Sequence, residues 1–276
     1  MDEQKLEDLR TRLAEQVAAI TSGEDWRRWL KQGTKFHGYS FRNVVLIAMQ
    51  APDATRVAGY RKWQELGRQV RKGERGIVIL APLTRKTAAE GDVEAVSRVV
   101  GFTGASVFDL AQTDGEPLAE PPQPELIEGE APDGMQAGLV SQIEAAGFAY
   151  DEGPLEDGMK GVTRYGPRTV TIDDALTNAE KAMVTAHELA HVLLHDPTQF
   201  DRAGHCRGRG EVEAESVAFI VSTARGLDTA KSSFAYVAGW IAGVPGQDTE
   251  KVLESTGAVV MRTAKRILAP FEEEAS

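Results

Sequence analysis

The N-terminal region repeats apolar and polar positions at helical spacing. The second predicted helix begins after residue 23, is expected to stop at Gly33, and carries Trp26 and Trp29 toward the core. The third covers 41–50, with Ser40 as its expected cap. The first predicted helix precedes these two in the chain. It is amphipathic, because one of its faces carries Leu6, Leu9, Leu13, Val17 and Ile20.

Two β-rich runs follow these helices. The segment GIVILAP, at 76–82, is short, apolar and ended by proline, so it predicts a buried strand. The segment RVVGFTGASVFDL, at 98–110, predicts a strand pair or a bulged strand because Gly101 and Gly104 interrupt it. The first module is therefore expected to be α+β.

A composition change divides the chain. Residues 113–134 hold five prolines, many acids and few large apolar groups, and are predicted to be a linker. This gives domains at 1–112 and 135–276. The second domain is expected to be mainly helical with a small sheet, so the whole chain is assigned to the α+β class. Its predicted elements are a strand at 168–173 and helices at 135–148, 175–195, 210–224, 234–242 and 249–268.

Composition then narrows the class of protein. A hydrophobic share of 42% and a charged share of 26% are typical of a globular chain. The single cysteine, Cys206, excludes an internal disulfide, and no signal-peptide pattern is present. No apolar run approaches the ~18 to 20 residues that span a bilayer. We therefore expect a cytoplasmic protein with no membrane partner.

Charge is distributed unevenly along the chain. The formal net charge is -11, which by itself argues against a nucleic-acid partner. However, residues 24–86 hold 14 Lys and Arg against 5 Asp and Glu, whereas residues 87–160 hold 2 against 16. A basic module is thus followed by an acidic one, and the basic module can still bind an anionic polymer.

A metal-binding pattern lies in HELAHVLLH, residues 187–195, which holds three of the chain's five histidines. Helical residues four apart differ by ~40° after a full turn, so His187 and His191 project side by side and can share Zn²⁺ at ~2.0 to 2.1 Å. Glu188 is rotated ~100° from His187 and can take a proton from zinc-bound water. The sequence therefore predicts a zinc site with Glu188 as the catalytic base.

Two histidines leave this site one protein ligand short, because catalytic zinc usually keeps three protein ligands and one water. Gluzincin-type peptidases draw the third ligand from a downstream helix, here GEVEAESVAFIV at 210–221. Glu211 is the predicted ligand. Glu215, one turn later on the same face, is predicted to orient a ligand histidine, and its own use as the ligand is the main alternative.

Other donors fit this site less well. His195 lies ~6 Å further along the helix than His191, so we expect it to be structural or to support a ligand. Glu213 is turned ~200° from Glu211 and cannot converge with it. His205 and Cys206, in the loop DRAGHCRGRG, would make a softer site with unusual spacing.

A basic stripe precedes the first predicted strand. Residues 56–80 interleave Tyr60 and Trp63 with cations, namely Arg56, Arg61, Lys62, Arg68, Arg71, Lys72 and Arg75. Such cations neutralise phosphates, and aromatic faces stack unpaired bases. A solvated basic face with a core tryptophan fits the composition equally well.

The same region resembles a known family. YSFRNVVLIAMQAPDATRVAGYRKWQELGRQVRKGERGIVILAP, followed by GFTGASVFDLAQTDGEPL, closely resembles the N-terminal domain of the ArdC family of antirestriction proteins. The resemblance implies a single-stranded-DNA-binding domain. It also implies DNA contacts at Arg42, Asn43, Arg56, Tyr60, Trp63, Arg68, Arg71 and Lys72.

The second half is similar to the zinc metallopeptidase domain that is joined to it in that family, and to the ImmA/IrrE peptidases. HELAHVLLH and EVEAESVAF stand where those proteins have HELxHxxxH and ExExxxxxF. Glu215 departs from the commoner Asn or Asp at its position. The resemblance covers most of residues 36–225.

These observations predict an antirestriction-type protein that binds single-stranded DNA and hydrolyses peptide bonds of an unknown protein substrate. One alternative is an ImmA/IrrE-like regulatory protease that cuts a specific partner. Another is a DNA-binding protein whose zinc is structural. Structural zinc sites normally have four protein ligands, and only three convergent ones are found here, so the sequence favours an enzyme.

Overall fold

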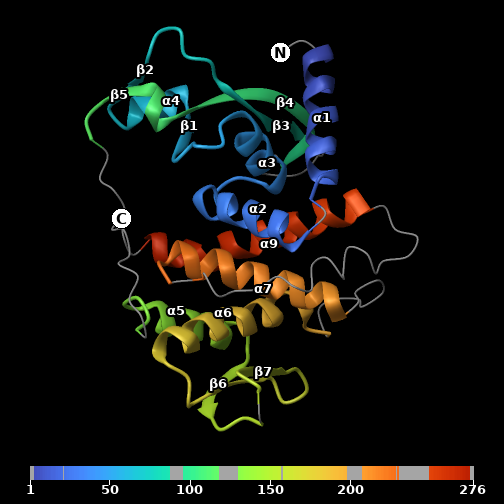
Figure 1. The fold of residues 1–276 in the computed structure, drawn as a ribbon, viewed down its shortest axis with the longest axis vertical. Coiled ribbons are helices and arrows are strands. Elements are labelled where there is room, and N and C mark those ends of the chain that lie inside the picture. Colours follow the sequence, from blue (N-terminus) through green and yellow to red (C-terminus); the bar gives the residue numbers. More distant parts are fainter. Residues whose placement is uncertain are drawn as a thin grey trace. The chain divides into compact units, whose positions relative to one another are not determined.

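A computed structural model of the chain describes residues 3–20, 22–87, 96–117, 130–156, 158–197, 207–227, 229 and 249–273. The chain divides into two compact units. The N-terminal unit comprises Met1–Ala19 and Arg42–Ala119, and the C-terminal unit comprises Ile20–Phe41 and Glu120–Ser276. Both units contain helices, and both contain strands, which confirms the predicted α+β class (Figure 1).

The N-terminal unit is built on a three-stranded antiparallel sheet in the order β1-β4-β3, beside a two-stranded sheet of β2 and β5. The runs predicted at 76–82 and 98–110 form the long hairpin β3–β4, whose register shifts between Leu83 and Thr84. The strands are β1 (Val57–Gly59), β2 (Arg68–Val70), β3 (Ile77–Thr87), β4 (Val96–Asp109) and β5 (Thr113–Gly115). The helices are α1 (Glu3–Ala18), α3 (Phe41–Gln50) and α4 (Tyr60–Glu65).

Helix α3 covers the open edge of β3 with two amide side chains. Asn43 donates to the carbonyl oxygen of Leu80 at 3.0 Å and accepts from its amide at 2.9 Å. Gln50, two turns later, makes the same pair of bonds with Val78, at 2.8 and 3.0 Å. Both side chains therefore bond the edge strand as a neighbouring strand would.

The C-terminal unit combines helices with a small mixed sheet in the order β6-β8-β7. Strand β8 is the one predicted at 168–173; β6 pairs with it in parallel and β7 antiparallel. The strands are β6 (Ala149–Gly153), β7 (Gly161–Arg164) and β8 (Thr169–Asp173). The helices are α2 (Gly23–Lys35), α5 (Met135–Ala145), α6 (Asn178–His195), α7 (Arg207–Ala224) and α9 (Thr249–Glu273).

Helix α2 packs in the C-terminal unit, although its residues lie within the stretch 1–112 that the sequence groups together. Trp26 is fully buried and its indole nitrogen donates to the Ser216 hydroxyl on α7 at 2.8 Å. Its ring centroid lies 4.7 Å from that of Trp29, which confirms that both tryptophans are core residues. The boundaries of the two compact units therefore differ from the predicted domain boundaries, because this buried helix packs on α7 of the C-terminal unit.

Three local expectations change in the structure. Gly33 does not end α2, which continues to Lys35; a Cβ at Gly33 would lie 3.1 Å from the Met261 sulfur, so the glycine permits close packing on α9. The start of the predicted linker is folded as β5. The helix predicted at 234–242 lies outside the described residues. Within the described part of the chain, no helix is both long and apolar enough to cross a membrane.

The edge contacts of α3 predict a difference between two similar substitutions. Asn43 is buried, so Asn43→Ala should leave the Leu80 backbone groups without partners and cost about 2 to 3 kcal/mol. Gln50 is exposed, so water can replace its bonds and Gln50→Ala should cost less than about 1 kcal/mol. Native-state hydrogen exchange at the Leu80 and Val78 amides measures both losses. Equal losses would contradict this account.

Candidate metal centre and nucleic-acid interface

Helix α6 carries the candidate metal centre, and both of its ends are fixed. At its start, the Glu180 amide donates to the Thr177 hydroxyl and the Glu180 carboxylate accepts from the Thr177 amide, which forms a capping box. At its end, the buried Asp196 accepts from Arg168 at 3.1 Å. Arg168 also donates to two carbonyl oxygens that follow α5. The helix is thereby held in place along its axis.

Three predicted ligands converge beside the middle of α6. His187 and His191 bring their Nε2 atoms to 3.0 Å from each other. Glu211, on α7, places Oε2 at 3.6 Å from each of these nitrogens. Donors bound tetrahedrally at ~2.1 Å lie about 3.4 Å apart, so the three separations are close to the edges of such a site. The donor set therefore fits a divalent metal ion.

The pKa values of the metal-free cluster show that the ligand residues interact strongly with one another. Burial would lower the pKa of His187, but its hydrogen bonds with Glu211 and Glu215 and the nearby charge of Glu188 raise it to about 10. The hydrogen bonds from His187 and His191 lower the pKa of Glu211. The acidic groups around His187 therefore favour a positive charge at this position.

Glu215 lies behind one of these ligands. Its Oε2 is 3.3 Å from Nδ1 of His187, the ring nitrogen turned away from Glu211. This is the position from which a carboxylate can orient a ligand imidazole. His205 and Cys206, the softer alternative donors, lie outside the described residues.

The expected base, Glu188, is buried and is held by a residue that the sequence did not indicate. The Thr163 hydroxyl, on β7, donates to Oε2 of Glu188 at 2.6 Å. A Cβ at Gly161, on the same strand, would lie 2.8 Å from Oε1 of Glu188 and 2.6 Å from Val184. Glycine at this position therefore lets β7 approach α6 closely enough for the Thr163 contact.

His195 is not part of the ligand cluster but contacts it from behind. Its Nδ1 lies 2.9 Å from Nδ1 of His191, and its Nε2 lies 3.1 Å from Oε2 of Glu213. Glu213 is almost fully buried and its other oxygen accepts from Arg209 at 2.9 Å. Burial favours a higher pKa for Glu213, but the bonds from His195 and Arg209 lower it.

The N-terminal unit has a pocket of about 760 Å³ within the predicted DNA-binding region. Tyr60 and Phe108 line it with aromatic rings, and Lys72 and Arg71 with cations. Tyr60 is 43% exposed, so its ring is accessible. The acids Glu74 and Asp114 line it as well, so the pocket combines a stacking surface with charges of both signs.

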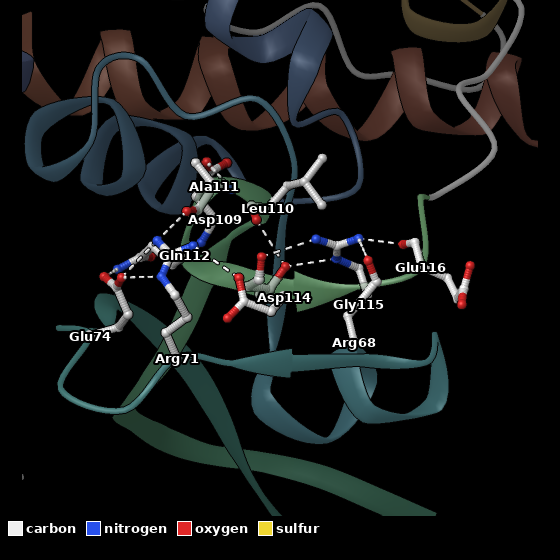
Figure 2. Close-up of polar contacts among 11 residues, drawn as sticks. Arg68, Arg71, Glu74, Asp109, Leu110, Ala111, Gln112, Asp114, Gly115 and Glu116 are labelled. Carbon is white, nitrogen blue, oxygen red and sulfur yellow. Dashed lines mark hydrogen bonds and ion pairs between the residues drawn. The ribbon is translucent and has the colours of Figure 1, made fainter.

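Two arginines near this pocket bond to the protein itself (Figure 2). Arg68 donates to Thr113 Oγ1 at 2.8 Å, to Thr113 O at 3.0 Å and to Gly115 O at 3.1 Å, and so holds β5 against β2. Arg71 pairs with Glu74 at 2.8 Å and with Asp114 at 3.4 Å. Phosphate contacts by either side chain would compete with these bonds.

The other predicted DNA contacts fall into two groups. Trp63 is fully buried, with its indole nitrogen donating to Phe108 O, and Asn43 is buried against β3. Neither presents an accessible face to a base, so their DNA contacts stay predictions that burial disfavours. The remaining side chains are exposed, namely Arg42, Arg56, Tyr60, Arg61, Lys62 and Lys72. Lys62 is paired with Glu65 at 3.1 Å.

Residues 7–108 match the family model described as the N-terminal domain of anti-restriction factor ArdC. The match confirms, over these residues, the predicted resemblance to the ArdC family. In Bacillus anthracis, an uncharacterized protein is 24% identical over 268 residues, which covers 83% of this chain and 45% of that relative. The chain thus spans about half the length of the curated relative.

The fold matches a solved ArdC protein over nearly its whole length. The metal-free crystal structure of antirestriction protein ArdC from the R388 plasmid gives a TM-score of 0.56 at 20% identity, covering 94% of this chain and 95% of that one. The Mn(II)-bound structure of the same protein gives a TM-score of 0.50 at 20% identity, covering 83% and 86%. At this identity the comparison establishes the shared fold.

The Thr163 contact predicts a stability loss that a hydroxyl can rescue. Thr163→Val keeps the side-chain shape but removes the donor to the buried Glu188 carboxylate, so it should cost about 1.5 to 3 kcal/mol of unfolding free energy. Thr163→Ser keeps the hydroxyl and should cost less. Urea unfolding of the metal-free chain measures both variants. The contact has no energetic role if the two variants lose the same stability.

Proposed function

We propose that this chain is an ArdC-type antirestriction protein that binds single-stranded DNA through its N-terminal unit and hydrolyses peptide bonds through its C-terminal unit. The observation that carries the hydrolytic part is the convergence of His187, His191 and Glu211 within 4.8 Å of one another, from two helices. Its protein substrate is unidentified. The family match and the shared fold support the antirestriction part.

His187, His191 and Glu211 would hold a divalent metal, and two imidazoles with one carboxylate suit zinc. When bound, such an ion lowers the pKa of water and polarises a carbonyl group. Glu188 would accept the proton of the attacking water and return it to the leaving amine. The Thr163 hydroxyl, which donates to Oε2, would hold the Glu188 carboxylate in place for this transfer.

The number of donors favours an enzyme over a structural metal site. Structural zinc is normally enclosed by four protein ligands, whereas catalytic zinc keeps three and an open position. Among the residues that the structure describes, the converging group contains three. An ion held by this group alone would keep a position for a water and a substrate carbonyl.

Glu188→Gln tests the enzymatic reading. The substitution removes the proton acceptor but no metal donor, so protein hydrolysis should fall about 10² to 10⁴-fold while metal content is retained. Proteolysis of denatured casein by the zinc-loaded and manganese-loaded chains, with and without single-stranded DNA, is the measurement. The comparison with and without single-stranded DNA also shows whether DNA activates the protease. Zinc is a scaffold if the loaded wild type cleaves nothing and Glu188→Gln still protects DNA from restriction.

The DNA-binding part is supported by the pocket that Tyr60, Phe108 and Lys72 line. An exposed tyrosine can stack an unpaired base, and a neighbouring lysine can neutralise a phosphate. Bases in a duplex are not available for such stacking. The arrangement therefore favours single strands over duplex.

Substitutions at Tyr60 and Lys72 separate stacking from charge. Tyr60→Leu should weaken binding of a single-stranded oligonucleotide by about 1 to 3 kcal/mol, while Tyr60→Phe keeps the ring and should bind nearly as wild type. Lys72→Ala should reduce the slope of log affinity against log salt by about 0.7. Fluorescence anisotropy over a salt series is the measurement. Equal affinity for duplex, or an affinity that salt does not change, would rule the proposal out.

A further inference from the structure

We infer that His195 and Glu213 position His191 for metal binding by fixing which of its two ring nitrogens carries the hydrogen. The inference rests on the metal centre of the proposed function. Neither residue belongs to the converging ligand group of the described chain. Both act through His191, so they are positioning residues.

The orientation of His191 determines which of its ring nitrogens can bind a metal. Its Nε2 faces the ligand cluster, 3.0 Å from His187 Nε2 and 3.6 Å from Glu211 Oε2. A metal ligand needs a lone pair on that nitrogen, so the hydrogen of the neutral ring must be on Nδ1. Nδ1 lies 2.9 Å from Nδ1 of His195. Only one of these two nitrogens can carry a hydrogen in their shared bond.

Glu213 decides which one does. A carboxylate only accepts hydrogen bonds, so His195 Nε2, at 3.1 Å from Glu213, must carry the hydrogen of that contact. The Nδ1 of a neutral His195 is then without hydrogen and accepts from His191 Nδ1. His191 Nε2 is left with its lone pair directed at the cluster. The hydrogen bonds thus form a series from Glu213 through His195 to His191, in which each bond fixes the direction of the next.

Arg209 keeps the series anchored. Its Nε donates to Glu213 Oε1 at 2.9 Å, and its Nη2 donates to the Ser255 hydroxyl on α9 at 3.1 Å. Arginine is always charged, so it pairs the negative charge of a carboxylate that is only 1% exposed. A Cβ built at Gly210 would lie 3.5 Å from Cε1 of His195, in ordinary contact, so this position on α7 is next to the ring.

Tautomers can be read directly in the metal-free wild type. Long-range ¹H–¹⁵N spectra of the full chain at about pH 8, where ordinary imidazoles are neutral, should show the Nδ1–H form of His191 and the Nε2–H form of His195. An Nε2–H form of His191 would overturn the inference. This measurement needs no variant, and it does not depend on whether the protein cleaves peptides.

Zinc affinity tests the consequence. Glu213→Gln introduces an amide that can donate to His195 and reverse the series, so zinc binding measured by competition with a chromophoric chelator should weaken about 10 to 100-fold. His195→Leu should weaken it similarly, whereas His195→Gln, which retains an acceptor and a donor, should stay close to wild type. Glu144→Gln, at an exposed carboxylate on α5, controls for the loss of one charge.

A double variant separates positioning from general destabilisation. Glu213→Gln added to His195→Leu should cause no further loss of zinc affinity, because the series is already broken. Independent, additive losses would contradict the inference, as would equal affinities of His195→Leu and His195→Gln. A wild type that binds no zinc would refute the metal centre itself, while zinc binding without proteolysis would refute only the hydrolase proposal.

Discussion

Two imidazoles on one helix can share an ion only if another element brings a third donor to the same point, and the packing of α6 with α7 meets this constraint. The helical period alone sets His187 beside His191. Glu211 reaches them because α7 lies along α6 in the C-terminal unit. Everything else at the site depends on that alignment, including the support that Glu215 and Glu213 give from the same helix.

The N-terminal unit shows that a count of basic residues does not measure a DNA-binding surface. Arg68 and Arg71 contribute to the positive charge of the sequence, yet their guanidinium groups hold the β2–β5 pair and bond to Glu74. Trp63 adds to the aromatic content but is enclosed in the core. Exposed side chains such as Tyr60 and Lys72 therefore define the surface available to a partner.

Local signals were predictable from sequence, whereas contacts between distant segments were mostly not; the approach of Glu211 to His187 and His191 is the exception. Helical spacing was enough to pair His187 with His191, and β-branched runs located β3 and β4. Thr163 was missed because β7 has only the short alternation GVTRYG to indicate it. Gly33 was read as a helix end because no local pattern reports that α9 packs against it. Trp26 likewise joins α7 through a bond spanning 190 positions.

The amide pairs of Asn43 and Gln50 have a consequence for crowding. At high local concentration, an open strand edge invites pairing between copies of a chain. Along β3, the backbone groups of Val78 and Leu80 are already bonded to α3. A neighbouring copy therefore cannot add a strand at Val78 and Leu80, which protects this part of the edge from aggregation.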